Sequence, residues 1–434
     1  MKLNWFSPLP PAKTDIAHFT KRVLPALASL AEVTLWTDQR NWDRQLEDFA
    51  AVRTYRLEKI PWRELNGSDI TFYQIGNNPL FHGNIWQLSQ RHPGVIVLHD
   101  FRLHHFFDGL YRVQWRDRNA YLATMTRFYG EQGRKDGDEC FKSDAKNIEY
   151  MAERYPLTQL AIENALGVIV HNPQSFEALA RNLESPLAYV PLPFLVNPIP
   201  KAPDKSGPPY RLILFGYLGR NRRLSSVFKA LAEMPEKDQF HLDIFGNILD
   251  DEKEVRSQIS TLRLKNHITL HGFSSETDLD KYLSQSDLAI NLRFPTVGEA
   301  SGSQLRIWAH ALPSLVTQVG WYGTLSPDAV AFVRPDGNEI EDIQRHLKAF
   351  LANPNRFETM GRQGRKELEQ NHSPEKYAGA LIEMAKMAMS ARSQSAFLEL
   401  AERAAWNAGN WANAGSSEKL FSKTAAEIFA MTSR

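Results

Sequence analysis

The chain alternates, in both halves, between short runs of apolar, β-branched residues and segments with helical periodicity. Strands buried in a parallel sheet are typically such runs, about four to eight residues long and bounded by turn signals. Strands that alternate with helices predict an α/β fold, here two doubly wound parallel-sheet (Rossmann-like) domains. The expected strands are Lys2–Leu9, Glu32–Thr37, Ile70–Ile75, Gly94–His99, Gly167–His171, Ala188–Pro191, Arg211–Phe215, His241–Phe245, Ile268–Leu270, Leu288–Leu292, Ser314–Val319 and Ala329–Val333.

A proline-rich segment separates the two halves. Residues 197–209 contain five prolines and no periodicity, which is typical of a linker. We therefore expect an N-terminal domain over 1–196, a second domain over 210–373, and C-terminal helices over 374–434 that return to the first domain. Such domains face each other across a cleft, and doubly wound sheets bind ligands beyond the carboxyl ends of their strands. The strand ends are therefore the places to look for chemistry.

The overall charge is nearly balanced, with 51 basic and 50 acidic residues and a formal net charge of +1. No global field therefore favours nucleic acid, and any anion site must be local. The single cysteine, Cys140, excludes an intramolecular disulfide and fits a reducing compartment. The first residues lack a secretory signal, and no apolar run approaches the roughly 20 residues of a membrane span. We expect a cytoplasmic protein, with peripheral contact at the inner face of a membrane left open.

The first strand of the second domain leads into a glycine- and arginine-rich turn. Gly216 and Gly219 would let the backbone approach a ligand, and a helix that begins just after them would offer free N–H groups to an anion. Arg220, Arg222 and Arg223 would oppose the dipole of that helix unless an anion were bound. The turn binds phosphate or is a solvated basic surface. It matches neither a Walker loop nor the dinucleotide fingerprint.

A second turn of this kind follows the strand Leu288–Leu292. Ser301, Gly302 and Ser303 are expected to begin a helix and to expose its N–H groups. Gly298 and Glu299 come just before that start. The carboxylate of Glu299 either complements the helix dipole or accepts hydrogen bonds from sugar hydroxyls. Two anion-binding turns at the strand ends of one domain favour a binding site over two unrelated surface turns.

Histidines gather at a strand end of the first domain. His99 and Asp100 end one strand, while His104 and His105 are expected to begin a helix. A metal site would need a tight fold-back of the chain to bring these side chains together, so we do not predict one. His171 lies at another strand end, where a structural role is the simpler interpretation.

Several segments resemble retaining bacterial glycosyltransferases of family four, the group 1 type, which have the GT-B fold. The donor-site segment of that family is similar to PTVGEASGSQLRIWAHALPSLVTQVGWYGTL, and its phosphate loop is similar to FGYLGRNRRLSSVFKAL. Segments of its N-terminal domain resemble SPLPPAKTDIAHFT, VIVLHDFRLHHF and YPLTQLAIENALGVIVHNPQSFEAL. The resemblance extends in the family's order from about residue 4 to about residue 385. It is specific for the family and says little about the substrate.

The resemblance implies a donor site in the second domain. Arg222 would neutralise the donor diphosphate, with Arg220 or Arg223 as helpers, and Glu299 would hold the donor sugar. Backbone groups of the two turns would contact sugar and phosphate. The base would lie near Gly272, Phe273 and Asn247, and the remaining donor-binding positions are Gly216, Gly219, Gly298, Ser301, Gly302 and Ser303.

The resemblance also places the acceptor in the first domain and gives His99 a catalytic position beside the donor sugar. Asp100 would orient the His99 ring or bind an acceptor hydroxyl. Asp15 stands where many relatives have glycine, so it would narrow or polarise the acceptor entrance. Ile307 stands where many relatives have a second glutamate that contacts the ribose, and this departure weakens the prediction of the donor.

The expected reaction is sugar transfer from a GDP-, UDP- or TDP-linked donor to a hydroxyl of a glycan or lipid-linked acceptor, as in bacterial surface polysaccharide or glycoconjugate synthesis. No carboxylate is evident as a nucleophile, so we expect retention by attack on the same face, without a metal or other cofactor. Arg222→Ala should then reduce turnover far more than stability. Alternatives are a non-catalytic nucleotide-sugar or glycan-binding protein, or an epimerase or phosphorylase of the same fold. The missing glycine fingerprint disfavours an oxidoreductase.

Overall fold

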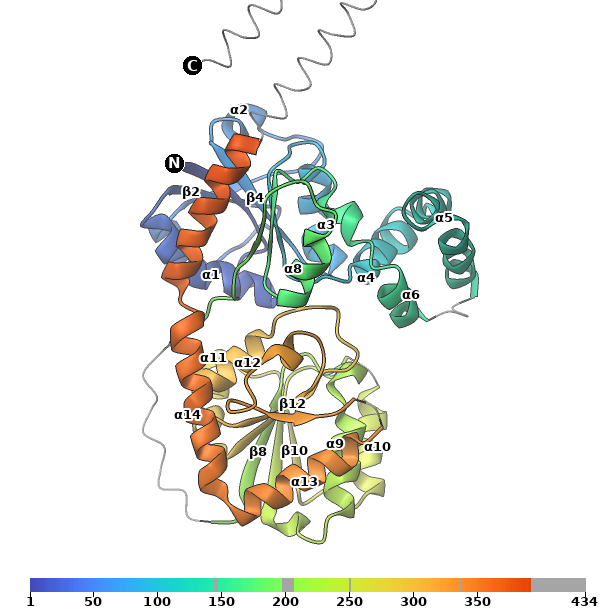
Figure 1. The fold of residues 1–434 in the computed structure, drawn as a ribbon, viewed down its shortest axis with the longest axis vertical. Coiled ribbons are helices and arrows are strands. Elements are labelled where there is room, and N and C mark those ends of the chain that lie inside the picture. The colour runs from blue at the N-terminus through green and yellow to red at the C-terminus, as the bar shows by residue number, and fades with distance from the viewer. Residues whose placement is uncertain (144–146, 197–206, 250, 336, 392–434) are drawn as a thin grey trace, which may run out of the picture.

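The computed structural model describes residues 1–143, 147–196, 207–249, 251–335 and 337–391. Most of the predicted linker at 197–209 and the predicted helices beyond residue 391 therefore lie outside the described residues. Within them the chain forms two doubly wound domains, one above the other in Figure 1, each with a central sheet covered by helices on both faces. The predicted fold class is confirmed.

The sheet of the first domain has seven parallel strands in the order β3-β2-β1-β4-β5-β6-β7. The chain starts in the middle of this sheet, builds one side, and then crosses to the other side through β4. The point of reversal between β1 and β4 leaves a crevice at the strand ends. The strands are β1 (Lys2–Phe6), β2 (Glu32–Thr37), β3 (Ala51–Thr54), β4 (Ile70–Ile75), β5 (Val95–Leu98), β6 (Gly167–Val170) and β7 (Leu187–Tyr189).

The second sheet repeats this plan with six parallel strands in the order β10-β9-β8-β11-β12-β13. Its reversal lies between β8 and β11, so the turns that follow these two strands come together. These are the two turns that the sequence singles out. The strands are β8 (Tyr210–Phe215), β9 (Phe240–Phe245), β10 (Ile268–Gly272), β11 (Leu288–Asn291), β12 (Ser314–Thr317) and β13 (Ala331–Val333).

Helices of the first domain are α1 (Asp15–Ala28), α2 (Trp62–Leu65), α3 (Pro79–Ser89), α4 (His104–Asp108), α5 (Arg118–Ser143), α6 (Ile148–Arg154), α7 (Thr158–Ile162) and α8 (Pro173–Ala180). Those of the second are α9 (Leu224–Glu233), α10 (Glu252–Thr261), α11 (Glu276–Gln285), α12 (Gly302–Ala309), α13 (Glu339–Ala352) and α14 (Pro354–Asn371). In Figure 1, α4, α5 and α6 project sideways from the first domain. The long α5 bends at Gly130, where φ is 65° and ψ is −162°.

A helix over residues 374–391 leaves the second domain and lies along the first, as the red helix of Figure 1 shows. Its buried residues Leu381, Met384 and Ala388 join the core that lies under β1. Gly167 in β6 makes room for this helix, because a Cβ atom there would lie 2.7 Å from the Met384 sulfur. The same core includes Trp308 of α12, so a single apolar cluster links the two domains.

Candidate active site

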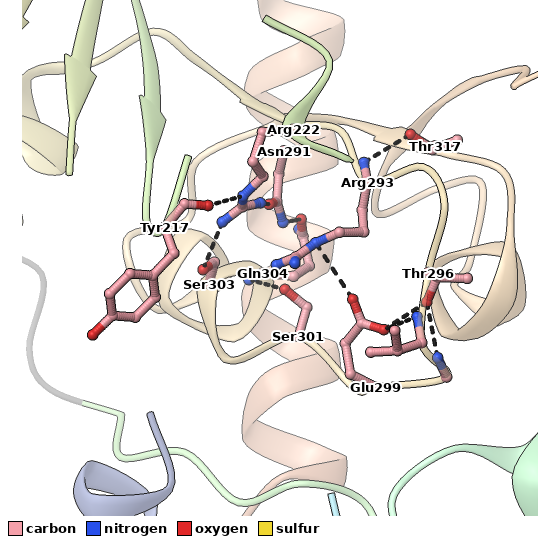
Figure 2. Close-up of polar contacts among 12 residues, drawn as sticks. Tyr217, Arg222, Asn291, Arg293, Thr296, Glu299, Ser301, Ser303, Gln304 and Thr317 are labelled. Atoms are coloured by element: carbon pink, nitrogen blue, oxygen red, sulfur yellow. Dashed lines mark hydrogen bonds and ion pairs between the residues drawn. The ribbon is translucent and has the colours of Figure 1, made fainter. Parts of the chain in front are cut away.

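Arg222 occupies the centre of the crevice in the second domain. A short turn, Arg220–Arg222, carries it back beneath the end of β8, where the side chain is 2% exposed. Its guanidinium donates to Asn291 Oδ1 at 2.7 Å and to the carbonyl of Phe215 at 2.9 Å, with a longer contact of 3.5 Å to Ser303 Oγ. Figure 2 shows the contacts of Arg222 with Asn291 from β11 and Ser303 from α12, and a longer contact of 3.4 Å to the carbonyl of Tyr217.

All of these partners of Arg222 are electrically neutral. Over the described ranges, no carboxylate lies within ion-pair distance of its guanidinium. Burial, together with the nearby Arg293 cation, lowers the pKa of Arg222 to about 10, so the side chain is still charged at neutral pH. A buried cation without a counter-ion favours an anionic ligand.

Two buried amides hold Arg222 in place. Asn291 accepts from Arg222 and donates to Gln304 Oε1 at 2.9 Å. Gln304, on α12, donates in turn to Ser314 Oγ at 2.8 Å. The chain of contacts fixes the guanidinium relative to both β11 and α12. Sequence reasoning missed Asn291 and Gln304, because neutral amides carry no signal of a site and their partners are distant in the chain.

Gly216 and Gly246 allow the close approach of backbones that this arrangement needs. Gly216 has φ of 119°, and a Cβ atom there would lie 2.4 Å from Arg222 Nη2. Gly246, with φ of 128°, passes so close that a Cβ atom would lie 1.8 Å from the Gly216 carbonyl oxygen. Both positions therefore require glycine. Gly219 has no such constraint in its φ or its surroundings.

Glu299 lies beside a second arginine, Arg293, whose side chain is partly buried. Its Oε2 atom accepts from the Thr296 hydroxyl at 2.6 Å and from the Val297 N–H at 2.9 Å, while Oε1 lies 3.4 Å from Arg293 Nε. Burial lowers the pKa of Arg293, but Glu299 and Tyr322 together raise it above its ordinary value. The site thus has one buried cation, one partly buried cation and one carboxylate. Sequence reasoning left Arg293 out of the site, although it directly follows a strand end.

The helix start predicted after Glu299 is present as α12. Ser301 caps it, with its hydroxyl accepting from the Gln304 N–H at 3.1 Å, and Gly302 and Ser303 form its first turn. A Cβ atom on Gly302 would meet nothing within 4 Å, so the space above this turn is open to a ligand. In Figure 2 the Arg222 and Arg293 side chains reach toward the same region beside Ser301 and Ser303. Two arginines and a helix N-terminus thus face one site.

The other predicted donor positions lie nearer the surface. Arg220 and Asn247 are exposed, and Phe273 is 62% exposed after Gly272 at the end of β10. Lys13 from the first domain lies over the Phe273 ring at 5.2 Å.

Arg223 turns away from the arginine pair. It forms a two-pronged contact with the buried carboxylate of Glu339, with both Nε–oxygen distances at 3.0 Å. Its charge is therefore compensated inside the domain. Ile307 also faces inward, 1% exposed, in an apolar cluster with Phe215 and Phe245, so the position of the second glutamate belongs to the core.

His99 lies at the end of β5 in the first domain. Its Nε2 atom is 2.9 Å from Gln74 Oε1, and its ring lies edge-on to Phe19 at 4.8 Å. Burial, with His171 and His82 nearby, holds the pKa of His99 well below its ordinary value. The neutral imidazole is therefore the form present at physiological pH. Gln74 had no signal in the sequence, because it lies inside the apolar strand β4.

Asp100 and Asp15 both belong to the first domain. Asp100 accepts from the Asn77 N–H at 2.7 Å, and burial together with the charge of Glu299 raises its pKa to about 7. Asp15 is exposed at the start of α1, and its charge is one of the influences that raise the pKa of Arg222 and of Arg293. The two carboxylates predicted on the acceptor side thus interact electrostatically with charged groups of the second domain.

His104 and His105 have partners away from His99. His104 is buried between the Tyr155 carbonyl, at 2.6 Å, and the Tyr121 hydroxyl, at 2.9 Å, while His105 pairs with Glu149. Among the described residues, no group of three or more metal-ligating side chains comes together.

Three comparisons with known proteins bear on this geometry. Residues 197–367 match the family model described as "Glycosyl transferases group 1". No sequence of a curated protein matches the chain. Over the described part of the chain, the helices are too short or too polar to span a bilayer.

Solved structures share the fold over almost the full length of the chain. Sucrose-phosphate synthase from Thermosynechococcus elongatus has a TM-score of 0.61 at 16% identity, covering 90% of this chain and 100% of that one. HepE from Anabaena, in complex with UDP and glucose, has a TM-score of 0.60 at 15% identity, covering 89% and 99%. A glycosyltransferase from Rickettsia africae has a TM-score of 0.61 at 12% identity, covering 89% and 98%. The fold is GT-B, and the family match supports a glycosyltransferase.

Proposed function

We propose that the chain is a retaining glycosyltransferase of family four, which moves a sugar from a nucleoside-diphosphate sugar to a hydroxyl acceptor. The observation that carries this proposal is the presence of two nearby arginines beside the N-terminus of α12, the buried Arg222 and the partly buried Arg293, with a single carboxylate, Glu299, next to Arg293. A diphosphate supplies the missing negative charge. In this assignment residues 210–373 hold the donor and residues 1–196 hold the acceptor.

Negative charge grows on the diphosphate as the bond to the sugar breaks. Arg222, Arg293 and the N–H groups of α12 are already oriented toward this charge, so they stabilise the transition state more than the ground state. The acceptor hydroxyl attacks the face from which the diphosphate leaves, and its proton passes to a phosphate oxygen. Retention follows from this same-face attack.

Neutral His99 and the carboxylate of Glu299 face the donor sugar in this scheme. Glu299 accepts hydrogen bonds from sugar hydroxyls, and Thr296 and Val297 keep it oriented. Because the two arginines carry the leaving charge, we propose that the reaction needs no divalent metal or other cofactor. Asp100 and Asp15 line the acceptor side.

The acceptor that we propose is a glycan or a lipid-linked glycan of bacterial surface polysaccharide or glycoconjugate synthesis. A cytoplasmic enzyme would meet a lipid-linked acceptor at the inner face of the membrane. UDP is the first donor nucleotide to test, since the HepE structure from Anabaena contains it; GDP and TDP are the alternatives.

A thermal-shift screen with UDP, GDP and TDP in the presence of EDTA tests the donor site, with ADP, CMP and NAD as controls. A ligand that binds only the native state raises Tm by mass action. We expect a shift with one diphosphate that is reduced in Arg222→Lys. Incubation of the matching nucleotide sugar with an acceptor panel then tests transfer. Binding without transfer or donor hydrolysis would instead indicate a non-catalytic sugar-nucleotide-binding protein, and a response to NAD alone would refute the proposal.

A further inference from the structure

The loop that carries Glu299 is hydrogen-bonded directly to the first domain. The carbonyl of Val297 accepts from the N–H groups of Phe101, at 2.9 Å, and Arg102, at 2.7 Å. The Arg102 side chain donates to the Thr296 carbonyl at 2.9 Å, and Asn172 Nδ2 donates to the Gly298 carbonyl at 3.3 Å. Three consecutive carbonyls of one domain are thus bound by donors of the other.

The two loops also fit closely at Gly298. This residue has φ of 82°, and a Cβ atom there would lie 2.6 Å from the Cβ atom of Phe101. Only glycine allows both the backbone conformation and this approach. The contact is therefore a specific, closely packed interface between the two domains.

Both sides of this interface carry residues of the proposed site. His99 and Asp100 directly precede Phe101, and Glu299 directly follows Gly298. Thr296 and Val297, whose carbonyls are held by the first domain, are the same residues that donate to Glu299 Oε2. A shift of this loop would therefore move the Glu299 carboxylate relative to the donor sugar.

We propose that Arg102 and Asn172 are positioning residues that hold Glu299 in place when the two domains are closed. The inference rests on the proposed function, because it assigns these residues to the same reaction. Among the described residues, the polar contacts of these two side chains are to Thr296, Glu153, Gly298 and Gln174, and none is to Arg222, Arg293 or the first turn of α12. We therefore expect nucleotide binding to be independent of both. These residues instead orient Glu299 toward the donor sugar and so favour the attack of the acceptor hydroxyl on that sugar.

The test compares UDP affinity with turnover in variants that keep the local fold. Asn172 also caps α8, where its Oδ1 accepts from the Gln174 N–H at 3.0 Å. Asn172→Asp and Asn172→Ser keep an N-cap but remove the donor to Gly298, and the serine variant controls for the added charge. Arg102→Met keeps the apolar stem and removes the donor to Thr296. Arg127→Met, in the same domain and paired on the surface with Glu163, is the matched control.

We expect Arg102→Met to lower kcat about 10- to 100-fold, and each Asn172 variant about 3- to 10-fold, because one charged and one neutral hydrogen bond are lost. The dissociation constant for UDP should stay within about threefold of wild type in all of them, and Arg127→Met should match wild type. An unchanged kcat in Arg102→Met and Asn172→Ser would overturn the proposal. So would a loss of UDP affinity as large as the loss of kcat.

Small-angle X-ray scattering separates this inference from the proposed function. With UDP bound, Arg102→Met/Asn172→Ser should have a larger radius of gyration than wild type, because the closed arrangement has lost two of its links. This result would stand even if wild type transferred no sugar, which would refute the function alone. Transfer by wild type together with equal scattering and equal kcat in the double variant would refute the positioning role alone.

Discussion

Arg222 differs from a surface arginine because its guanidinium donates hydrogen bonds to several neutral groups of the protein. Truncation to alanine would leave Asn291 Oδ1 unpaired in the core, at a cost of about 1–3 kcal/mol. The expectation that Arg222→Ala spares stability is therefore revised: that variant should lose both activity and stability. The sharper change is Arg222→Lys, which keeps the charge.

Arg222→Lys should weaken UDP binding about tenfold or more, because one ammonium group cannot reproduce the planar contacts to Asn291 and Phe215 while facing a phosphate. Isothermal titration calorimetry measures this directly. Arg223→Lys is the control, since Arg223 is bound to Glu339 and should leave UDP affinity unchanged. Equal affinities for wild type and Arg222→Lys would exclude Arg222 from the donor site.

Asp100 should make stability depend on pH. Its pKa is raised from 3.8 to about 7, so the folded state favours the protonated form. This carboxyl contributes stability below its ordinary pKa, and the contribution is lost as the pH rises through about 7. Asp100→Asn stays neutral and should gain Tm relative to wild type between pH 5.5 and 8. If the Tm of Asp100→Asn and the Tm of wild type changed with pH in the same way over that range, Asp100 would not be the group that makes stability depend on pH.

Charged side chains at strand ends could be selected from the sequence, as Arg222, Glu299 and His99 were. Their partners could not, because Asn291, Gln304 and Gln74 are neutral amides without a pattern of their own. The proposed helper role of Arg223 shows the other limit. Its carboxylate partner, Glu339, lies 116 positions further along the chain, and only the folded domain brings the two together.

At the scale of elements, the turn after β8 and the turn after β9 pack directly against each other at Gly216 and Gly246. Gly246→Ala would place a Cβ atom against the Gly216 carbonyl and should destabilise the protein by about 3 kcal/mol or more. Differential scanning calorimetry should show a clear fall in Tm. Gly379→Ala is the control, because it meets nothing within 4 Å in a helix and should leave stability equal or slightly higher. An equal Tm for Gly246→Ala and Gly379→Ala would contradict the close packing of Gly246 against Gly216.

All twelve predicted strands are present, because buried parallel strands have continuous apolar runs. The strand that was missed, β3 (Ala51–Thr54), lies at the sheet edge and is largely exposed, so it lacks such a run. The projecting helices α4, α5 and α6 were also not predicted as a unit. The bend of α5 at Gly130 and the buried contacts of His104 with Tyr121 and Tyr155 belong to this unit, and neither has a periodic signature in the sequence.

At the scale of the whole molecule, the first domain depends on a helix from the far end of the described chain. Leu381 is fully buried against the core of the first domain. Leu381→Ala should therefore cost about 2–5 kcal/mol of unfolding free energy. Urea denaturation followed by tryptophan fluorescence reports this loss, since Trp5 lies in the same core. Met387→Ala, at a position that is 44% exposed, should change little, and similar losses in both would mean that the helix contributes no specific packing.

The return of this helix means that the polypeptide passes between the domains twice, once after β7 and once after α14. The two passages are bonded to each other: the Phe194 N–H donates to the His372 carbonyl at 2.8 Å, and His372 Nδ1 lies 2.6 Å from the Leu192 carbonyl oxygen. Two adjacent connections that are bonded to each other restrict the relative motion of the domains more than a single connection would. In the proposed reaction, opening and closing of the cleft about these residues would bring Glu299 back to the same place beside the first domain.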